Sequence, residues 1–216
     1  MKPVLSIAAV SRRALLQSAG AVALAGCSSN LIGPPPAPQI YVLHPDFSPV
    51  ANAPMVSWQL VVSVPAAPES LDTERIALVR APNTMDYYAS SQWTDRVPLL
   101  VQSLLVEAFE KSNRINAVGR ESAGIRADYV LESEIRDFSA HYTVLDTPPK
   151  IRVGITAKLV GALSRDVAAT MQFENEAQAA ANNMSSIAAA FAQATEAAVS
   201  RIVSWTLQLQ VSQRSR

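Results

Sequence analysis

Residues that could serve acid–base, nucleophilic or metal chemistry are few and scattered along this chain. The two histidines, His44 and His141, stand in no metal-ligand spacing, and the usual general base is therefore scarce. Ser122 lies between Gly119 and Gly124, but the run lacks the Gly-x-Ser-x-Gly spacing of a nucleophile elbow, so we interpret it as a loop. The sequence also has no phosphate loop, no His-Glu-x-x-His helix and no dinucleotide fingerprint. It therefore predicts no catalytic residue, no metal site and no cofactor, and it indicates a protein that is not an enzyme.

Two pairs of glutamates are candidates for an acid–base dyad. Glu132 and Glu134 share one face of a predicted strand, and Glu174 and Glu176 share a face of another. Solvated strand faces explain both pairs more simply, because alternate residues of a strand point the same way and an exposed face collects charges. We favour this second interpretation.

Cys27 is the only cysteine, and it ends a segment typical of an export signal. Residues 1–26 contain three bases, no acid and an apolar stretch shorter than the roughly 20 residues that a membrane-spanning helix needs. The stretch closes with Leu24-Ala25-Gly26-Cys27, which resembles the lipobox of bacterial lipoproteins. We predict cleavage between Gly26 and Cys27 and acylation of the Cys27 thiol, palmitate included. The Arg12-Arg13 pair resembles a twin-arginine signal, so the general secretory and twin-arginine routes both stay open.

A proline-rich spacer follows at residues 27–39, where the run from Gly33 to Pro38 predicts an extended, polyproline-like tether. Residues 40–210 have enough apolar content for a single folded domain, and residues 211–216 form a polar tail. The chain beyond Cys27 carries 15 bases and 18 acids, a composition that gives no reason to expect a nucleic-acid partner.

Hydrophobic periodicity predicts the elements of this domain. Apolar residues recur at helical spacing from Arg96 to Phe109 and from Ser185 to Leu209, which predicts two helices. Strand signals occur at residues 40–43, 58–64, 75–80, 85–88, 115–118, 128–142, 152–160 and 167–174. A change of parity in the longest strand indicates a β-bulge near Arg136 or Asp137. The sum is an α+β fold: a mixed, mainly antiparallel sheet of about five to seven strands with two main helices packed on one face.

Three aromatic residues, Tyr87, Tyr88 and Trp93, cluster around a short polar run. They are candidates for a surface that contacts a partner protein or lipid. The alternative is that their rings cap the core where a strand meets the first helix, and we favour that alternative.

Nearly the whole chain beyond Cys27 resembles the ABC-type transport auxiliary lipoprotein family, which includes the PqiC-like lipoproteins. The resemblance rests on these segments, in this order: Tyr41-Val42-Leu43, Leu71 to Ile76, Tyr88 to Trp93, Arg96-Val97-Pro98, Ala127 to Leu131, Ile135 to Phe138 and Ala189-Ala190-Phe191. It implies a non-catalytic periplasmic component of a lipid-trafficking ABC system that uses mammalian-cell-entry (MCE) domain proteins.

The resemblance also implies a place and partners. The lipoprotein is expected at the periplasmic face of the outer membrane, because Ser28 after Cys27, in place of an Asp, is read as permission to leave the inner membrane. The expected partners are an MCE-domain protein of an ABC lipid transporter and the membrane, through the lipid on Cys27. Phospholipid and a second copy of the chain are further candidates. The main alternative is a periplasmic lipid-binding carrier with a groove between sheet and helices, whereas the missing nucleophile motif disfavours an envelope hydrolase.

Overall fold

The computed structural model describes residues 37–48, 53–80, 84–124, 126–144 and 146–209. The elements in these residues are, in chain order, β1 (Gln39–Tyr41), β2 (Val56–Val62), β3 (Arg75–Arg80), β4 (Thr84–Trp93), α2 (Val97–Ser112), β5 (Ile115–Arg120), the 3₁₀ turn η1 (Glu121–Ala123), β6 (Tyr129–Tyr142), β7 (Lys150–Gly161), β8 (Val167–Gln178) and α3 (Met184–Gln208). The predicted signal at residues 1–26, Cys27, most of the tether and the tail at 211–216 lie outside the described residues.

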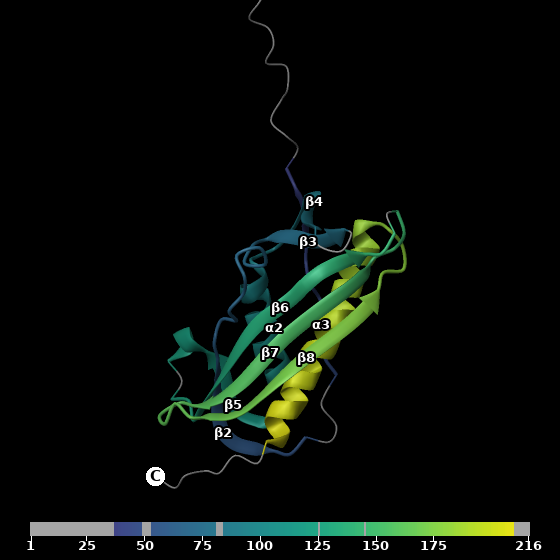
Figure 1. The fold of residues 1–216 in the computed structure, drawn as a ribbon. Helices are drawn as coiled ribbons and strands as arrows, with labels where there is room; N and C mark the ends of the chain where they lie inside the picture. The colour runs from purple at the N-terminus through teal and green to yellow at the C-terminus, as the bar shows by residue number, and fades with distance from the viewer. Residues whose placement is uncertain (1–36, 49–52, 81–83, 125, 145, 210–216) are drawn as a thin grey trace, which may run out of the picture. The chain divides into compact units, whose positions relative to one another are not determined.

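The long strand β6 organises the sheet. On one side it pairs antiparallel with β7 over nearly its whole length. On the other side it pairs parallel with β2 near its start and with β3 near its end. β5 extends the β2 side, β4 and β1 extend the β3 side, and β8 pairs antiparallel with β7 (Figure 1). The described residues thus form a mixed sheet of eight strands.

Both helices lie against the same face of this sheet (Figure 1). α2 has Pro98 in its first turn, where a backbone N–H has no partner within the helix, so the proline removes no helical hydrogen bond. Asn113, which adopts a left-handed φ of 51°, caps the C-terminal end of the helix. α3 begins after Asn183, whose side-chain oxygen accepts a hydrogen bond from the Ser186 N–H at 2.9 Å. Local chemistry at these ends therefore defines where each helix begins or stops.

The core fills the space between the sheet and the helices. Alternate residues of β6 and β7 point into it, and Leu131, Ile135, Ile155 and Leu159 have no exposed surface. The predicted two-residue periodicity of these strands therefore marks the face that the helices cover.

β6 contains the predicted β-bulge. Its register with β7 shifts between Ile135 and Asp137, so Arg136 is the extra residue. Gly154 lies opposite, where a Cβ would approach the Asp137 backbone nitrogen to 3.4 Å. The bulge also changes the parity of β6, which turns Phe138 toward the core.

The α+β class with two helices on one face is confirmed, and the sheet has one strand more than the predicted range. The largest difference in bounds concerns β4, which runs from Thr84 to Trp93 whereas the sequence indicated a strand only at residues 85–88. The extra part passes through Ser90 at a left-handed φ of 52° and pairs with β1. Its polar residues carry no period-two apolar signal, so sequence patterns could not extend the strand.

Candidate functional site

Trp93, the largest of the three predicted contact residues, lies in the core. Its side chain is 1% exposed, and its ring makes edge contacts with Phe138 and Phe191 at centroid distances of 6.1 and 5.1 Å. The register shift in β4 near Ser90 turns this residue toward the helices. In this structure Trp93 therefore packs the core, as the favoured interpretation expects, and it offers no surface for the alternative contact role.

Tyr88 lies half-buried on the same side of the sheet as Trp93. Its hydroxyl lies 2.8 Å from the Tyr142 hydroxyl, which in turn donates to the Asn182 side-chain oxygen at 2.7 Å. Because the Tyr142 hydroxyl donates its hydrogen atom to the bond with Asn182, the Tyr88 hydroxyl is the donor in the Tyr88–Tyr142 pair. Burial, together with the hydrogen bond to Tyr142, raises the pKa of Tyr88 well above its ordinary value. The Tyr88 hydroxyl is thus neutral and lies in a hydrogen-bond chain that runs from Tyr88 through Tyr142 to Asn182.

Tyr87 points to the other side of the sheet, because neighbouring residues of a strand alternate. The Arg75 guanidinium lies 3.5 Å from its ring centroid, and its hydroxyl donates to the Ser70 carbonyl at 3.0 Å. The three aromatic residues therefore do not form one surface, and a contact role for Tyr87 or Tyr88 stays a prediction.

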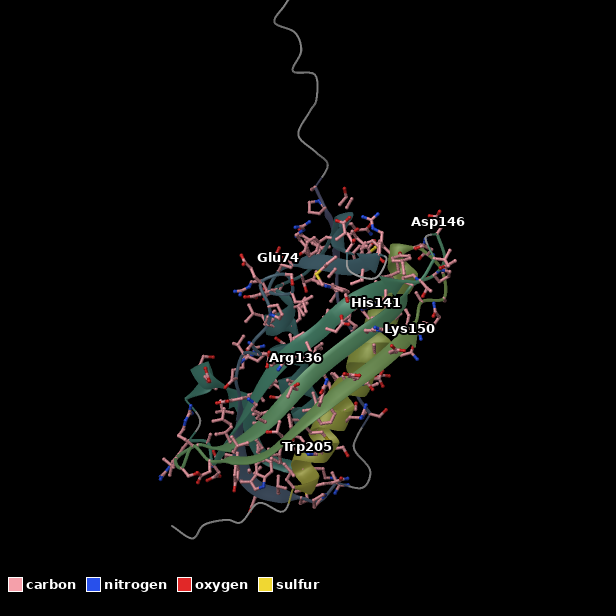
Figure 2. All side chains as sticks on the ribbon, viewed as in Figure 1. Glu74, Arg136, His141, Asp146, Lys150 and Trp205 are labelled. Atoms are coloured by element: carbon pink, nitrogen blue, oxygen red, sulfur yellow. The ribbon has the colours of Figure 1, made fainter. Side chains whose placement is uncertain are left out.

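The first glutamate pair lies on the open face, by which we mean the face of the sheet away from the helices. Glu134 forms an ion pair with Arg136 at 2.8 Å, and Glu132 lies 3.9 Å from Arg165. Arg136 is labelled on this face in Figure 2. Each carboxylate is partly exposed beside a cation, as the solvated-face interpretation expects.

The second glutamate pair lies on the open face of β8. The Glu176 carboxylate is 3.1 Å from the Lys150 ammonium and accepts a hydrogen bond from Arg152 at 2.9 Å. The hydrogen bond from Lys150, followed by the charges of both cations, lowers the pKa of Glu176. An acid–base dyad needs one carboxyl whose pKa is raised, and these contacts act in the opposite direction.

Asp137, Ser139 and His141 meet on the open face of β6, an arrangement that sequence reasoning missed. The His141 Nε2 atom lies 3.0 Å from the Ser139 Oγ and 3.0 Å from an Asp137 carboxylate oxygen, and Ser139 also contacts the other oxygen of Asp137. A catalytic triad needs the serine and the carboxylate on different ring nitrogens, whereas here both contact the same one. The signal for the cluster was the Asp-x-Ser-x-His spacing, which places all three side chains on one strand face. The cluster is a hydrogen-bonded patch and not a proton relay.

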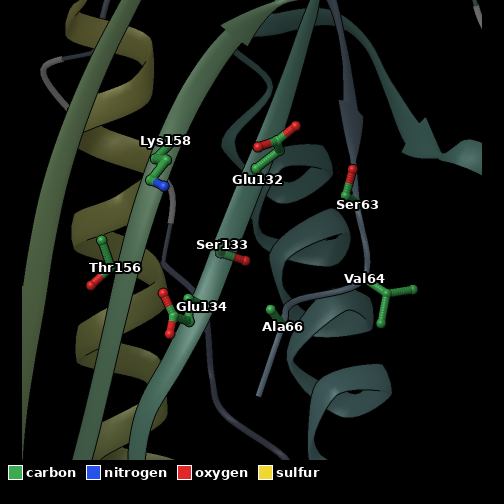
Figure 3. A pocket seen from close by; sticks show the side chains of 8 residues that line it. All are labelled: Ser63, Val64, Ala66, Glu132, Ser133, Glu134, Thr156 and Lys158. Atoms are coloured by element: carbon green, nitrogen blue, oxygen red, sulfur yellow. The ribbon is translucent and has the colours of Figure 1, made fainter. Parts of the chain in front are cut away.

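A depression of about 300 Å³ opens where the chain after β2 runs beside β6 (Figure 3). Its lining mixes polar and apolar side chains: Ser63, Val64, Ala66, Glu132, Ser133, Glu134, Thr156 and Lys158. The buried Ser133 hydroxyl has no hydrogen-bond partner among the described residues. Carboxylates at the mouth suit water or a small polar group better than an acyl chain.

The space between sheet and helices is the place where a lipid carrier would hold acyl chains. In the described chain that space is filled by side chains such as Ile155, Phe191 and Val199, each 0% exposed. A second depression lies at the start of α3, and its lining is mostly small or polar: Gln178, Ala180, Ser185, Ser186, Ala189, Ala190 and Gln193. Neither depression offers the apolar channel that the carrier alternative requires.

The described residues show neither a metal-binding cluster nor a membrane-spanning helix. No group of three or more His, Cys, Asp or Glu side chains there is placed to hold a metal ion. In the same residues no helix combines the length and apolar character that crossing a membrane requires.

Comparison with known proteins places these features in a family. The model of the ABC-type transport auxiliary lipoprotein component matches residues 41–203. The crystal structure of protein XCC0632 from Xanthomonas campestris is 31% identical, with a TM-score of 0.74 over 78% of this chain and 94% of that one. The uncharacterized protein bll6063 of Bradyrhizobium diazoefficiens is 27% identical over 185 residues, which are 85% of this chain and 49% of that protein. The chain thus spans about half the length of this curated relative.

The matched residues run from Tyr41 in β1 to Val203 in α3 and so cover the described domain almost completely. The family is one of transport auxiliary lipoproteins and is not an enzyme family. The chain belongs to the family of ABC-type transport auxiliary lipoprotein components.

Proposed function

We propose that this protein is a lipid-anchored periplasmic lipoprotein that docks an MCE-domain protein at the outer membrane, as the auxiliary component of an ABC-type lipid transport system. The observation that carries the proposal is the family match over residues 41–203, the whole described domain. The transported lipid is handled by the partner proteins, and this chain supplies a fixed attachment point.

The anchor in this proposal is the lipid on Cys27. Each buried methylene of an acyl chain contributes about 0.8 kcal/mol, so two or more chains hold a protein stably at a membrane. Nine residues separate Cys27 from Ala37, and an extended proline-rich chain of this length, rising about 3.1 Å per residue, spans about 30 Å. Anchoring confines the domain to this layer and raises its local concentration near a partner in the same layer.

The filled interior favours docking over lipid carriage. A carrier must bury acyl chains in an apolar cavity, whereas the side chains facing the helices here are closely packed. The exposed surface of the sheet is charged and ion-paired, which suits contact with protein and water.

The docking claim is tested by pull-down. The full-length lipoprotein, purified in mild detergent, is immobilised and incubated with the periplasmic region of an MCE-domain protein from the same organism. We expect retention of the MCE protein by the unaltered chain. Failure of a correctly folded chain to retain it, at micromolar concentrations and physiological salt, contradicts the docking claim.

The anchor is tested by Cys27→Ser. This variant lacks the thiol that is acylated, so we expect it to lose labelled palmitate and to leave the outer-membrane fraction. Its circular dichroism spectrum and its MCE binding in solution should match those of the unaltered chain, because Cys27 lies outside the folded domain in this proposal. Retention of the label by the variant would show that another residue is acylated.

A further inference from the structure

β8 is the last strand on its side of the sheet. It pairs with β7 along its length, and no second strand lies beside it in the described residues. An outermost strand leaves a row of backbone N–H and C=O groups unpaired, and proteins usually cover such an edge or interrupt it with charge, proline or bulges.

The C-terminal part of this edge is covered from α3. The Arg201 guanidinium donates to the Glu174 carbonyl at 3.0 Å and to the Asn175 side-chain oxygen at 3.2 Å. It also lies 5.6 Å from the centroid of the Phe173 ring. An incoming strand would have to displace this arginine, so the edge is covered at Glu174 and Asn175.

The N-terminal part of the edge has no side chain of the described residues laid over it, and its register with β7 shifts between Val167 and Ala169. The run from Val167 to Phe173 contains no charged residue and no proline. Val167 is 56% exposed and Met171 43% exposed, and Leu163 in the preceding turn is 91% exposed. Uncharged, apolar, exposed edges of this length are the ones to which other strands add.

The backbone direction can be read from Glu174. Its carbonyl is bonded by Arg201 and not by β7, so it points to the open edge. Backbone groups alternate between the two sides of a strand, so the N–H and C=O groups of Thr170 and Gln172 point to that edge as well. Two residues of the uncovered part are therefore available for a strand ladder.

We propose that the edge from Val167 to Phe173 binds an extended segment of a partner protein, which joins the sheet as an additional strand. The register shift with β7 places Val167 and Met171 on opposite faces of the sheet, so apolar side chains on both faces of that segment would cover them. The carboxylates of Asp166 and Glu174 flank the run, and neither forms an ion pair with another described residue. A basic side chain near each end of the segment complements them.

A second copy of this chain fits the edge less well. β8 contains Glu174 and Glu176 and no Lys or Arg, so pairing two copies of it adds only carboxylates. The other outermost strands, β1 and β5, have three and six residues, and both are too short to pair with the whole run. The charge and the length both favour a different chain.

The inference deepens the proposed function and rests on it for the partner's identity. β8 begins at the β7–β8 turn, which lies at the opposite end of the domain from β1, where the described chain enters (Figure 1). The partner proposed for this end of the domain is a protein of the transport system.

The test removes one backbone donor. Gln172→Pro deletes the edge-facing N–H without removing a bond to β7, and proline is tolerated at this position of an edge strand. Gln172→Ala is the matched control, because it loses the same side chain, including its hydrogen bond to Glu174, and keeps the N–H. Circular dichroism and thermal unfolding verify that both variants fold.

The first probe is a labelled synthetic peptide of alternating valine and threonine with a lysine at each end. Fluorescence anisotropy measures its binding to the full-length protein in detergent. We expect binding by the unaltered chain and the alanine variant, and binding weaker by roughly tenfold or more in the proline variant. Absence of binding to the unaltered chain, or equal binding by all three, overturns the inference.

The second probe is the MCE protein of the pull-down. Loss of its binding in Gln172→Pro, with binding kept in Gln172→Ala, supports the edge as the docking surface, whereas equal binding by both variants overturns it. If the unaltered chain does not bind the MCE protein, the proposed function is contradicted. Binding of the peptide then still tests whether the edge accepts an additional strand. Analytical ultracentrifugation tests the other occupant: self-association that Gln172→Pro abolishes would assign the edge to a second copy.

Discussion

The two faces of the β6–β7 ladder differ in chemistry although they alternate residue by residue along the same strands. On the face that the helices cover, Leu131 and Ile135 are completely buried. On the open face, the neighbouring Glu132 and Glu134 are partly exposed beside arginines. Buried apolar area contributes about 25 cal/mol per Å², whereas an exposed ion pair contributes about 0–1 kcal/mol. The covered face therefore holds the fold together, whereas the ion pairs of the open face contribute little to stability.

The largest effect is expected on the covered face, from Trp93→Ala. Removing a fully buried indole that contacts Phe138 and Phe191 leaves a cavity, and we expect a loss of about 3–5 kcal/mol in the free energy of unfolding. Urea unfolding at neutral pH measures it. Arg152→Ala on the open face is the control and should cost less than about 1 kcal/mol. Similar losses of unfolding free energy in both variants would contradict the proposed difference between the two faces.

An intermediate effect is expected where a polar pair is built into the covered side, from Tyr88→Phe. The variant loses the hydrogen bond to Tyr142, which costs about 1 kcal/mol at neutral pH. Because the pKa of Tyr88 is raised in the folded chain, its hydroxyl ionises near pH 10 in the unfolded chain and only at higher pH in the folded chain. Stability due to this group is therefore present below pH 10 and declines above it.

Unfolding of the two chains at pH 7 and at pH 11 measures this dependence. The gap in stability between the unaltered chain and Tyr88→Phe should narrow at the higher pH, because the variant has no hydroxyl to ionise at this position. A gap that widens on raising the pH would show that the hydroxyl is not buried as described.

The smallest effect is expected on the open face, from Glu176→Gln. The pKa of Glu176 is lowered by Lys150 and Arg152, so its contribution is present above the ordinary carboxyl pKa and is lost as pH falls through the folded value. Exposure limits the contribution to less than about 1 kcal/mol. Urea titrations at pH 7 and pH 3 in low salt, repeated in 1 M salt, measure it. A loss as large as that of Trp93→Ala would contradict the assignment of this face as solvated.

The parts of the fold that sequence patterns predicted are those in which burial repeats with a regular period. Ile151 to Leu159 alternate strictly between the two faces, and the stripe from Ile187 to Ile202 follows one side of α3. The bulge at Arg136 was readable because it breaks that alternation. These signals are local, so a single sequence contains them.

The other features depend on contacts between distant segments. Nothing local to Trp93 shows that a left-handed Ser90 turns it toward Phe191. The open edge of β8 depends on Arg201 reaching back from α3, and periodicity carries no information about that contact. The candidate site was therefore less predictable than the fold, because burial of an aromatic residue and exposure of an edge are both tertiary properties.

The central position of β6 has a consequence for the time course of folding. β2 and β3 precede it by a long stretch of chain, and the Gln59 N–H bonds a carboxylate oxygen of Asp128, 69 residues later, at 2.9 Å. Parallel pairing of strands so far apart in sequence requires a large loop to close. The entropy cost of closing it comes before the strand contacts that offset it, which makes folding slow. Until Tyr129 to Tyr142 has been synthesised, β2 and β3 lack the strand that joins them. The β3–β4 and β2–β5 pairs can form without β6, but they remain separate until the middle of the chain joins them into one sheet.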